Sequence, residues 1–164
     1  MRNLMMGFSV AVIATSTFAA DERAAANVVK KYSEAIACQI QDVKYQRNQY
    51  KSVKVLQGDK ELGGLGDIYV VYWEGDVGCN AGNASVTPNF TVVEQNGFSS
   101  VSPVVVTDYK FPLLDMVLLT DFSVKNEKLL INGLTYGPND QQHNPSKKVS
   151  YTLKLDQINR AFVK

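Results

Sequence analysis

The chain has 164 residues, and its 17 lysines and arginines against 16 aspartates and glutamates give a formal net charge of +1. Nucleic-acid-binding proteins usually carry a concentrated basic surface, and peripheral membrane proteins carry a basic amphipathic face. Neither pattern is present in the sequence, so we expect no nucleic-acid partner, and the length predicts one ordinary domain.

The first residues have the pattern of a secretory signal peptide. Arg2 gives the positive start, Leu4–Ala14 is the apolar run, and Thr17 and Ala19 put small side chains at the two recognition positions of a cleavage site. A transmembrane helix needs about 20 apolar residues in a row, and this run has about half of that. We predict a cleaved signal peptide over residues 1–19.

Cleavage would leave a single domain of residues 20–164 and would remove Arg2, so that 16 basic residues would balance 16 acidic residues. A secretory signal directs the mature protein to the periplasm or to the extracellular medium. We expect no insertion into the membrane after cleavage, because the remaining sequence has no second apolar segment of comparable length.

The two cysteines, Cys38 and Cys79, are predicted to form one disulfide, because an isolated pair in an oxidising compartment is normally oxidised. The bridge would close a loop of about 40 residues, for which loop entropy gives a stabilisation of about 4 kcal/mol. Two distant cysteines and a single histidine match no zinc-binding pattern. We therefore expect no metal and no cofactor.

Residues 21–37 are predicted to form a helix, since their apolar side chains recur at helical spacing and Asp21 and Glu22 favour its positive end. The positions on the apolar face are Ala25, Val28, Val29, Tyr32, Ala35 and Ile36. This face is expected to pack against a sheet, with Trp73 largely buried beneath it.

Beyond the helix the apolar pattern changes to the period of two that is typical of strands. Seven segments have this pattern: 52–56, 67–73, 85–94, 101–109, 116–124, 128–136 and 148–156. Pro88 indicates an edge strand or a bulge in the third of them. We predict an α+β fold in which the N-terminal helix packs on one six- to seven-stranded, mostly antiparallel meander sheet, with one disulfide.

The segment Trp73–Gly82 is the first candidate binding site, because it concentrates carboxylates and glycines between two predicted strands. In a functional interpretation, Glu74 and Asp76 are exposed at the rim of the sheet and the glycines let a ligand approach the backbone. In a structural interpretation, Asp76 caps a turn and Cys79 forms the disulfide. The sequence leaves both interpretations open.

The same segment resembles a stretch found in a group of small exported Gram-negative proteins of unknown function. Their shared pattern is Trp-x-Gly-Asp-x-Gly-Cys-x-x-Gly, and the matching residues here are Trp73, Gly75, Asp76, Gly78, Cys79 and Gly82. The resemblance implies a periplasmic location. It implies no activity and no cofactor.

The second candidate site is the polar loop of residues 137–145, which contains His143, the one histidine of the chain. No nucleophile accompanies it in a recognised catalytic motif, so we assign no catalytic residue. His143 is instead a candidate binding residue alongside Glu74 and Asp76. The alternative is an ordinary solvated side chain.

Three functions fit these features. The leading hypothesis is a periplasmic binding or inhibitor module that presents sheet-edge loops to a periplasmic or extracellular protein. The second is a structural or assembly factor of the cell envelope that uses its strand edges or helix face. The third is a hydrolase of the cell wall or of a sugar that acts through Glu74, Asp76 or Asp115.

Overall fold

A computed structural model describes residues 17–58, 66–80, 86–95, 102–141 and 144–164. Within this part of the chain there is one helix, α1 (Thr17–Ile36), and two antiparallel sheets. Sheet A has the order β1-β3-β4-β5, with β2 also paired to β3, and sheet B has the order β6-β7-β8-β9. The predicted α+β class and the predicted strands are confirmed.

Most strand bounds follow the predicted segments closely, but β5 covers only three residues of the predicted segment 101–109, and two short strands, β1 and β9, were not predicted. Sheet A consists of β1 (Gln39–Ile40), β2 (Ser52–Leu56), β3 (Asp67–Asp76), β4 (Thr87–Gln95) and β5 (Val104–Val106). Sheet B consists of β6 (Leu118–Lys125), β7 (Lys128–Thr135), β8 (Lys147–Asp156) and β9 (Ala161–Val163).

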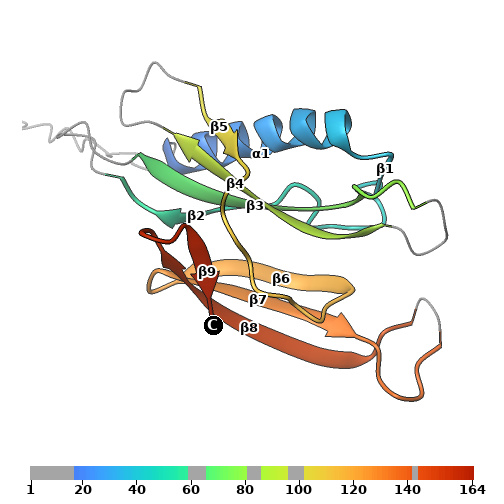
Figure 1. The fold of residues 1–164 in the computed structure, drawn as a ribbon. Coiled ribbons are helices and arrows are strands. Elements are labelled where there is room, and N and C mark those ends of the chain that lie inside the picture. Colours follow the sequence, from blue (N-terminus) through green and yellow to red (C-terminus); the bar gives the residue numbers. More distant parts are fainter. Residues whose placement is uncertain (1–16, 59–65, 81–85, 96–101, 142–143) are drawn as a thin grey trace, which may run out of the picture.

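The elements form three layers, with α1 on the outer face of sheet A and sheet B against its other face (Figure 1). The prediction of a helix on one continuous sheet was therefore wrong. Period-two alternation shows which side chains face inward, but it is the same whether successive strands continue one sheet or begin another. The helix covers sheet A alone.

The chain changes sheet directly after β5. Lys110 forms a parallel bridge with Ala161 of β9, and its backbone bonds with the Arg160 carbonyl at 2.9 Å and the Phe162 amide at 2.8 Å. The path from β5 down to sheet B crosses the space in front of the two sheets (Figure 1). This crossing ends the pairing with β4 after three residues, because β5 meets β4 only from Val92 to Glu94.

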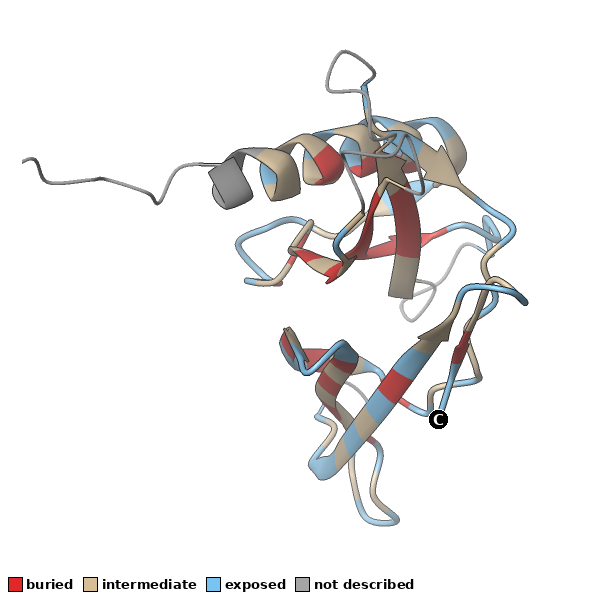
Figure 2. Ribbon diagram, turned by 90° about the vertical axis from the view of Figure 1, so that its left-hand side faces the viewer, coloured by how far each residue is buried: buried red, intermediate tan, exposed pale blue. Residues whose placement is uncertain are grey.

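Buried residues lie on the helix and on both sheets (Figure 2), and they form two hydrophobic clusters that hold the layers together. One lies between the sheets and includes Tyr72, Phe122 and Ile131, and the other lies between α1 and sheet A and includes Val29 and Trp73. Every residue of β3 is buried, since the helix covers one of its faces and sheet B covers the other. The predicted burial of Trp73 beneath the helix is confirmed.

A polar clamp also joins the sheets. Glu94 of β4 accepts hydrogen bonds from the Tyr109 hydroxyl at 2.7 Å and from the Arg160 guanidinium at 2.6 Å. The guanidinium also lies over the Tyr109 ring, 4.6 Å from its centroid. Burial and the neighbouring Glu94 carboxylate raise the pKa of the Tyr109 hydroxyl. This clamp fixes the start of the crossing segment, which is the connection of residues 107–117 between β5 and β6.

Replacing Trp73 with alanine is expected to lower the free energy of unfolding by about 3–5 kcal/mol, because it opens a cavity under α1. Trp73→Phe keeps most of the ring volume but loses the 2.8 Å hydrogen bond from the indole N–H to Thr91, and should cost about 1 kcal/mol. Urea unfolding measures both. Equal costs for the two variants would contradict the burial.

At the start of β3, the carboxylate of Asp67 is buried in a set of hydrogen bonds. It accepts from Lys54 at 2.7 Å, from the Gly58 amide at 2.8 Å and from the Tyr69 hydroxyl at 3.1 Å. Burial acts to raise the pKa of Asp67, but the bonds from Lys54 and Gly58 and the charge of Lys54 outweigh it, and the pKa lies below its ordinary value.

Asp67→Asn is expected to lower the free energy of unfolding near neutral pH by about 1–3 kcal/mol. The pKa of Asp67 is lower in the folded state, so its contribution is complete above the unfolded-state value of about 3.9 and disappears as the pH falls through the folded-state value. The difference between wild type and variant should therefore shrink at about pH 3.

Asp121→Asn is the control for this measurement, because Asp121 is exposed and lies 3.4 Å from Lys51 in a surface ion pair. Such pairs contribute about 0–1 kcal/mol, so we expect little change at either pH. A deficit of Asp67→Asn that stayed constant with pH would show that the charge of Asp67 is not responsible.

Candidate functional site

Glu74 does not lie exposed at the rim of the sheet, as the functional interpretation expected; its side chain is 6% exposed. Its carboxylate accepts hydrogen bonds from the Tyr72 hydroxyl and from the Gln46 amide, the latter at 2.6 Å. Burial and the Glu74 charge raise the pKa of Tyr72. The Gln49 side chain also pairs with the Glu74 backbone, at 2.8 Å to its N–H and 3.2 Å to its carbonyl. Glu74 therefore anchors the segment before β2.

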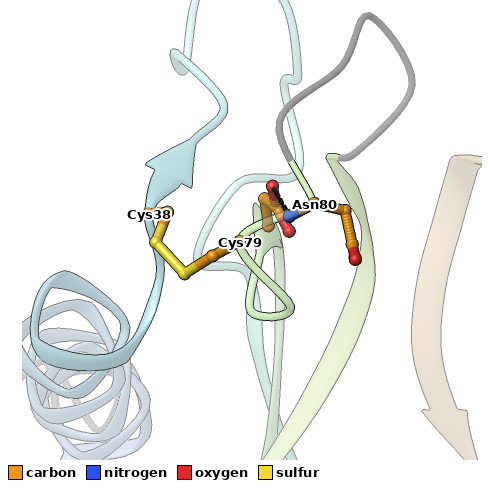
Figure 3. The surroundings of a disulfide bond; sticks show 4 residues. Cys38, Cys79 and Asn80 are labelled. Atoms are coloured by element: carbon orange, nitrogen blue, oxygen red, sulfur yellow. Dashed lines mark hydrogen bonds between the residues drawn. A yellow bond between two sulfur atoms is a disulfide. The ribbon is translucent and has the colours of Figure 1, made fainter.

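Asp76 is also buried, with 3% of its surface exposed. Its carboxylate accepts a hydrogen bond from the backbone N–H of Asn80 at 3.0 Å (Figure 3). Beside this turn, Cys38 and Cys79 form the predicted disulfide, with their Cα atoms 5.3 Å apart. The burial, the turn and the disulfide agree with the structural interpretation of the segment. The expected exposure of Glu74 and Asp76 was wrong, because carboxylates near glycines occur both in binding loops and in capped turns. The role of the two carboxylates in binding stays a prediction.

His143 lies outside the described residues, so its role in binding stays a prediction. The neighbouring part of its loop is held by Asp140, which accepts hydrogen bonds from the Gly137 amide at 2.7 Å and from the Ser146 hydroxyl at 2.6 Å. Bonds from Ser146 and from the Gly137 amide lower the pKa of Asp140. Glu74 and Asp76 lie in sheet A, and Asp140 lies in the β7–β8 connection of sheet B.

The open edge of β4 is a better candidate. Between Thr87 and Thr91 this strand pairs with β3 on one side, and no described strand pairs with its other side. Pro88 lies in this stretch, which agrees with the predicted edge position. A free strand edge is a template for pairing with another chain.

Two adjoining cavities follow this edge. A cavity of about 200 Å³ is lined by Tyr32 of α1 and by Trp73 of β3, and it extends to Phe90 and Phe111. A second cavity of about 440 Å³ shares Phe90 and Phe111 and continues to Leu113. Since both are lined by Asn89, Phe90 and Phe111, they form one groove between β4 and the crossing segment.

The groove has an exposed apolar wall. Leu113 is 91% exposed, and Val77, which lines the cavity next to α1, is also exposed. Phe90 and Phe111 stack with ring centroids 5.5 Å apart and are only partly buried. The sequence signal for this site was the apolar run of residues 111–114, which has no period-two alternation. From the sequence alone, this run lay before the predicted strand 116–124 and was compatible with a helical turn starting at Pro112.

No family model, curated protein or solved structure matches this chain. Over the described residues, no group of three or more histidine, cysteine, aspartate or glutamate side chains is arranged to hold a metal ion. No helix in that part of the chain has the length and apolar content needed to cross a membrane.

Glu74→Ala is expected to destabilise the fold by about 1–3 kcal/mol, because it leaves the buried Tyr72 hydroxyl and Gln46 amide without their acceptor. Glu34→Ala is the matched control: Glu34 is exposed on α1, and its loss should change stability by less than about 0.5 kcal/mol. Thermal or urea unfolding measures both variants. If they were equally stable, Glu74 would be available for another role.

Proposed function

We propose that this chain is an exported protein-binding module that holds a partner protein in the groove along the open edge of β4. The observation that carries the proposal is the coincidence of a free strand edge with a groove lined by Phe90, Phe111 and Leu113. Partner segments bound at sheet edges gain affinity from main-chain hydrogen bonds and specificity from side-chain pockets.

The proposed location rests on the predicted signal peptide over residues 1–19 and on resemblance to small exported proteins. The Cys38–Cys79 disulfide is compatible with it, because such bonds persist in oxidising compartments. Binding at the groove would serve either an inhibitor or an envelope assembly factor, since both need a stable partner. The identity of the captured partner distinguishes these two functions.

The hydrolase hypothesis receives less support from the geometry. Glycoside hydrolysis needs two carboxyl groups placed on either side of the scissile bond. Glu74 and Asp76 are buried and engaged in hydrogen bonds with Gln46 and Asn80. Asp115 accepts a bond from the Thr135 hydroxyl at 2.8 Å.

Photo-crosslinking in intact cells of the source organism tests the proposed surface. A photoreactive residue at Leu113 is expected to give one discrete adduct, because this side chain borders the groove. A photoreactive residue at Ile158 is the matched control, because Ile158 is an aliphatic side chain with 93% exposure that lines neither groove cavity. Mass spectrometry identifies the adduct.

The adduct at position 113 should also disappear when the groove is altered by Phe111→Asp in a protein that still unfolds cooperatively. An adduct of equal yield at Ile158, or no adduct at Leu113, would count against the groove. A photoreactive residue at Tyr45 tests the exposed turn before β2 in the same way. A discrete adduct at that position alone would place the binding surface at this turn.

A further inference from the structure

The direction of the backbone groups in β3 determines which N–H and C=O groups of β4 point to its open edge. The backbone N–H of Tyr72 donates to the Lys51 carbonyl at 2.9 Å, and the Glu74 carbonyl accepts from the backbone N–H of Gln41 at 3.0 Å. Both partners lie on the side of β3 away from β4. In an antiparallel sheet the N–H and C=O of one residue point to the same side, so Tyr72 and Glu74 make no ladder bonds with β4.

The pairing register between β3 and β4 gives the direction of the backbone groups in β4. Phe90 lies opposite Tyr72 and Pro88 lies opposite Glu74. These are therefore non-hydrogen-bonded pairs, in which the backbone groups of both residues point away from each other. The N–H and C=O of Phe90 and the C=O of Pro88 accordingly point to the open edge, where no described strand lies opposite them.

The two faces of this edge differ. The side chain of Thr91 faces α1, since it accepts the hydrogen bond from Trp73. The side chain of Phe90 faces sheet B, where its ring lies 5.7 Å from the ring of Phe122. The cavity of about 200 Å³ reaches the α1 face, and the cavity of about 440 Å³ continues on the side of sheet B.

Successive side chains of a strand point to opposite faces of its sheet. A strand added beside Phe90 would thus direct one side chain toward the cavity next to α1 and the following one toward the cavity next to Phe111. On the side of sheet B, apolar side chains follow Phe111 along the cavity, namely Pro112, Leu113, Leu114 and Met116.

The neighbouring strand limits the length of such a segment. β5 already occupies the edge of β4 from Val92 to Glu94. The free stretch from Thr87 to Thr91 is roughly 17 Å long at 3.4 Å per residue. An added strand must therefore end or turn away at the level of Val92.

We infer that the occupant of this groove is a short extended peptide segment of the partner protein that adds to sheet A beside Phe90. One residue of this segment lies opposite Phe90 and has its backbone N–H and C=O free for pairing. The segment also has two consecutive apolar side chains, and the larger of them faces Phe111 and Leu113. The inference rests on the proposed binding function and specifies the mode of recognition.

Panning of a random peptide library displayed on phage against the oxidised protein tests this mode. Enriched peptides are expected to share two adjacent apolar residues. In a synthetic version of an enriched peptide, replacing either of the two apolar residues with aspartate should weaken binding by about tenfold or more. Methylation of one backbone nitrogen should do the same, because it removes the N–H that pairs with the Phe90 carbonyl.

The variants of the protein provide the matched comparison. Leu113→Asp is expected to weaken peptide binding by about tenfold, and Ile158→Asp should leave it unchanged. Amide exchange read by NMR adds an independent readout, since the Phe90 N–H should exchange more slowly when the peptide is bound.

The outcomes separate the two proposals. Peptides that bind at Leu113 but tolerate methylation at every backbone nitrogen would overturn strand addition and leave the groove as a binding site. Crosslinking at Leu113 without any enriched peptide would also overturn strand addition alone. Absence of both peptide binding and crosslinking would overturn the groove and this inference together.

Discussion

The burial of β3 on both faces is the constraint from which the rest of the architecture follows. All ten residues of the strand are buried, with Trp73 and Tyr69 under the helix and Tyr72 and Val70 against sheet B. A strand of this kind needs an apolar layer on each side, because a solvated face would expose aromatic and branched side chains. The helix and the second sheet supply these layers.

Complete burial also explains the carboxylates at the two ends of β3. Asp67, Glu74 and Asp76 are acidic residues in a buried strand. Asp67 accepts from Lys54 of β2, Glu74 from Gln46 in the segment before β2, and one oxygen of Asp76 from the Asn80 backbone N–H in the turn after β3. A buried carboxylate without partners is expensive, so such groups organise the chain around them. Here they hold Lys54, Gln46 and Asn80, and thereby the segments that flank β2 and the disulfide. Glu74 and Asp76, the residues that suggested a binding loop, are thus buried at the end of the central strand.

The departure of the chain from sheet A after β5 leaves backbone groups of β4 without partners among the described strands, whereas the buried carboxylates of β3 all have hydrogen-bond donors. The crossing to β9 at Lys110 builds the contact between the sheets but leaves part of β4 without a neighbour. Free strand edges are usually shortened or blocked, and Pro88 removes one donor from this edge. Phe90 and the exposed Leu113 line the same cavity, and this combination is the basis of the proposed recognition of an extended chain.

The sequence by itself determined the helix, seven of the strands, the disulfide and the burial of Trp73, because each depends on local periodicity or on residue chemistry. Only the tertiary structure decided that the strands divide into two sheets, since alternation at residues 116–124 is equally compatible with either arrangement. It also decided that Glu74 and Asp76 are internal, because their burial depends on Gln46, Gln49 and Asn80 folding over them. The open edge of β4 could not be predicted, because an edge exists only once the position of every neighbouring strand is known.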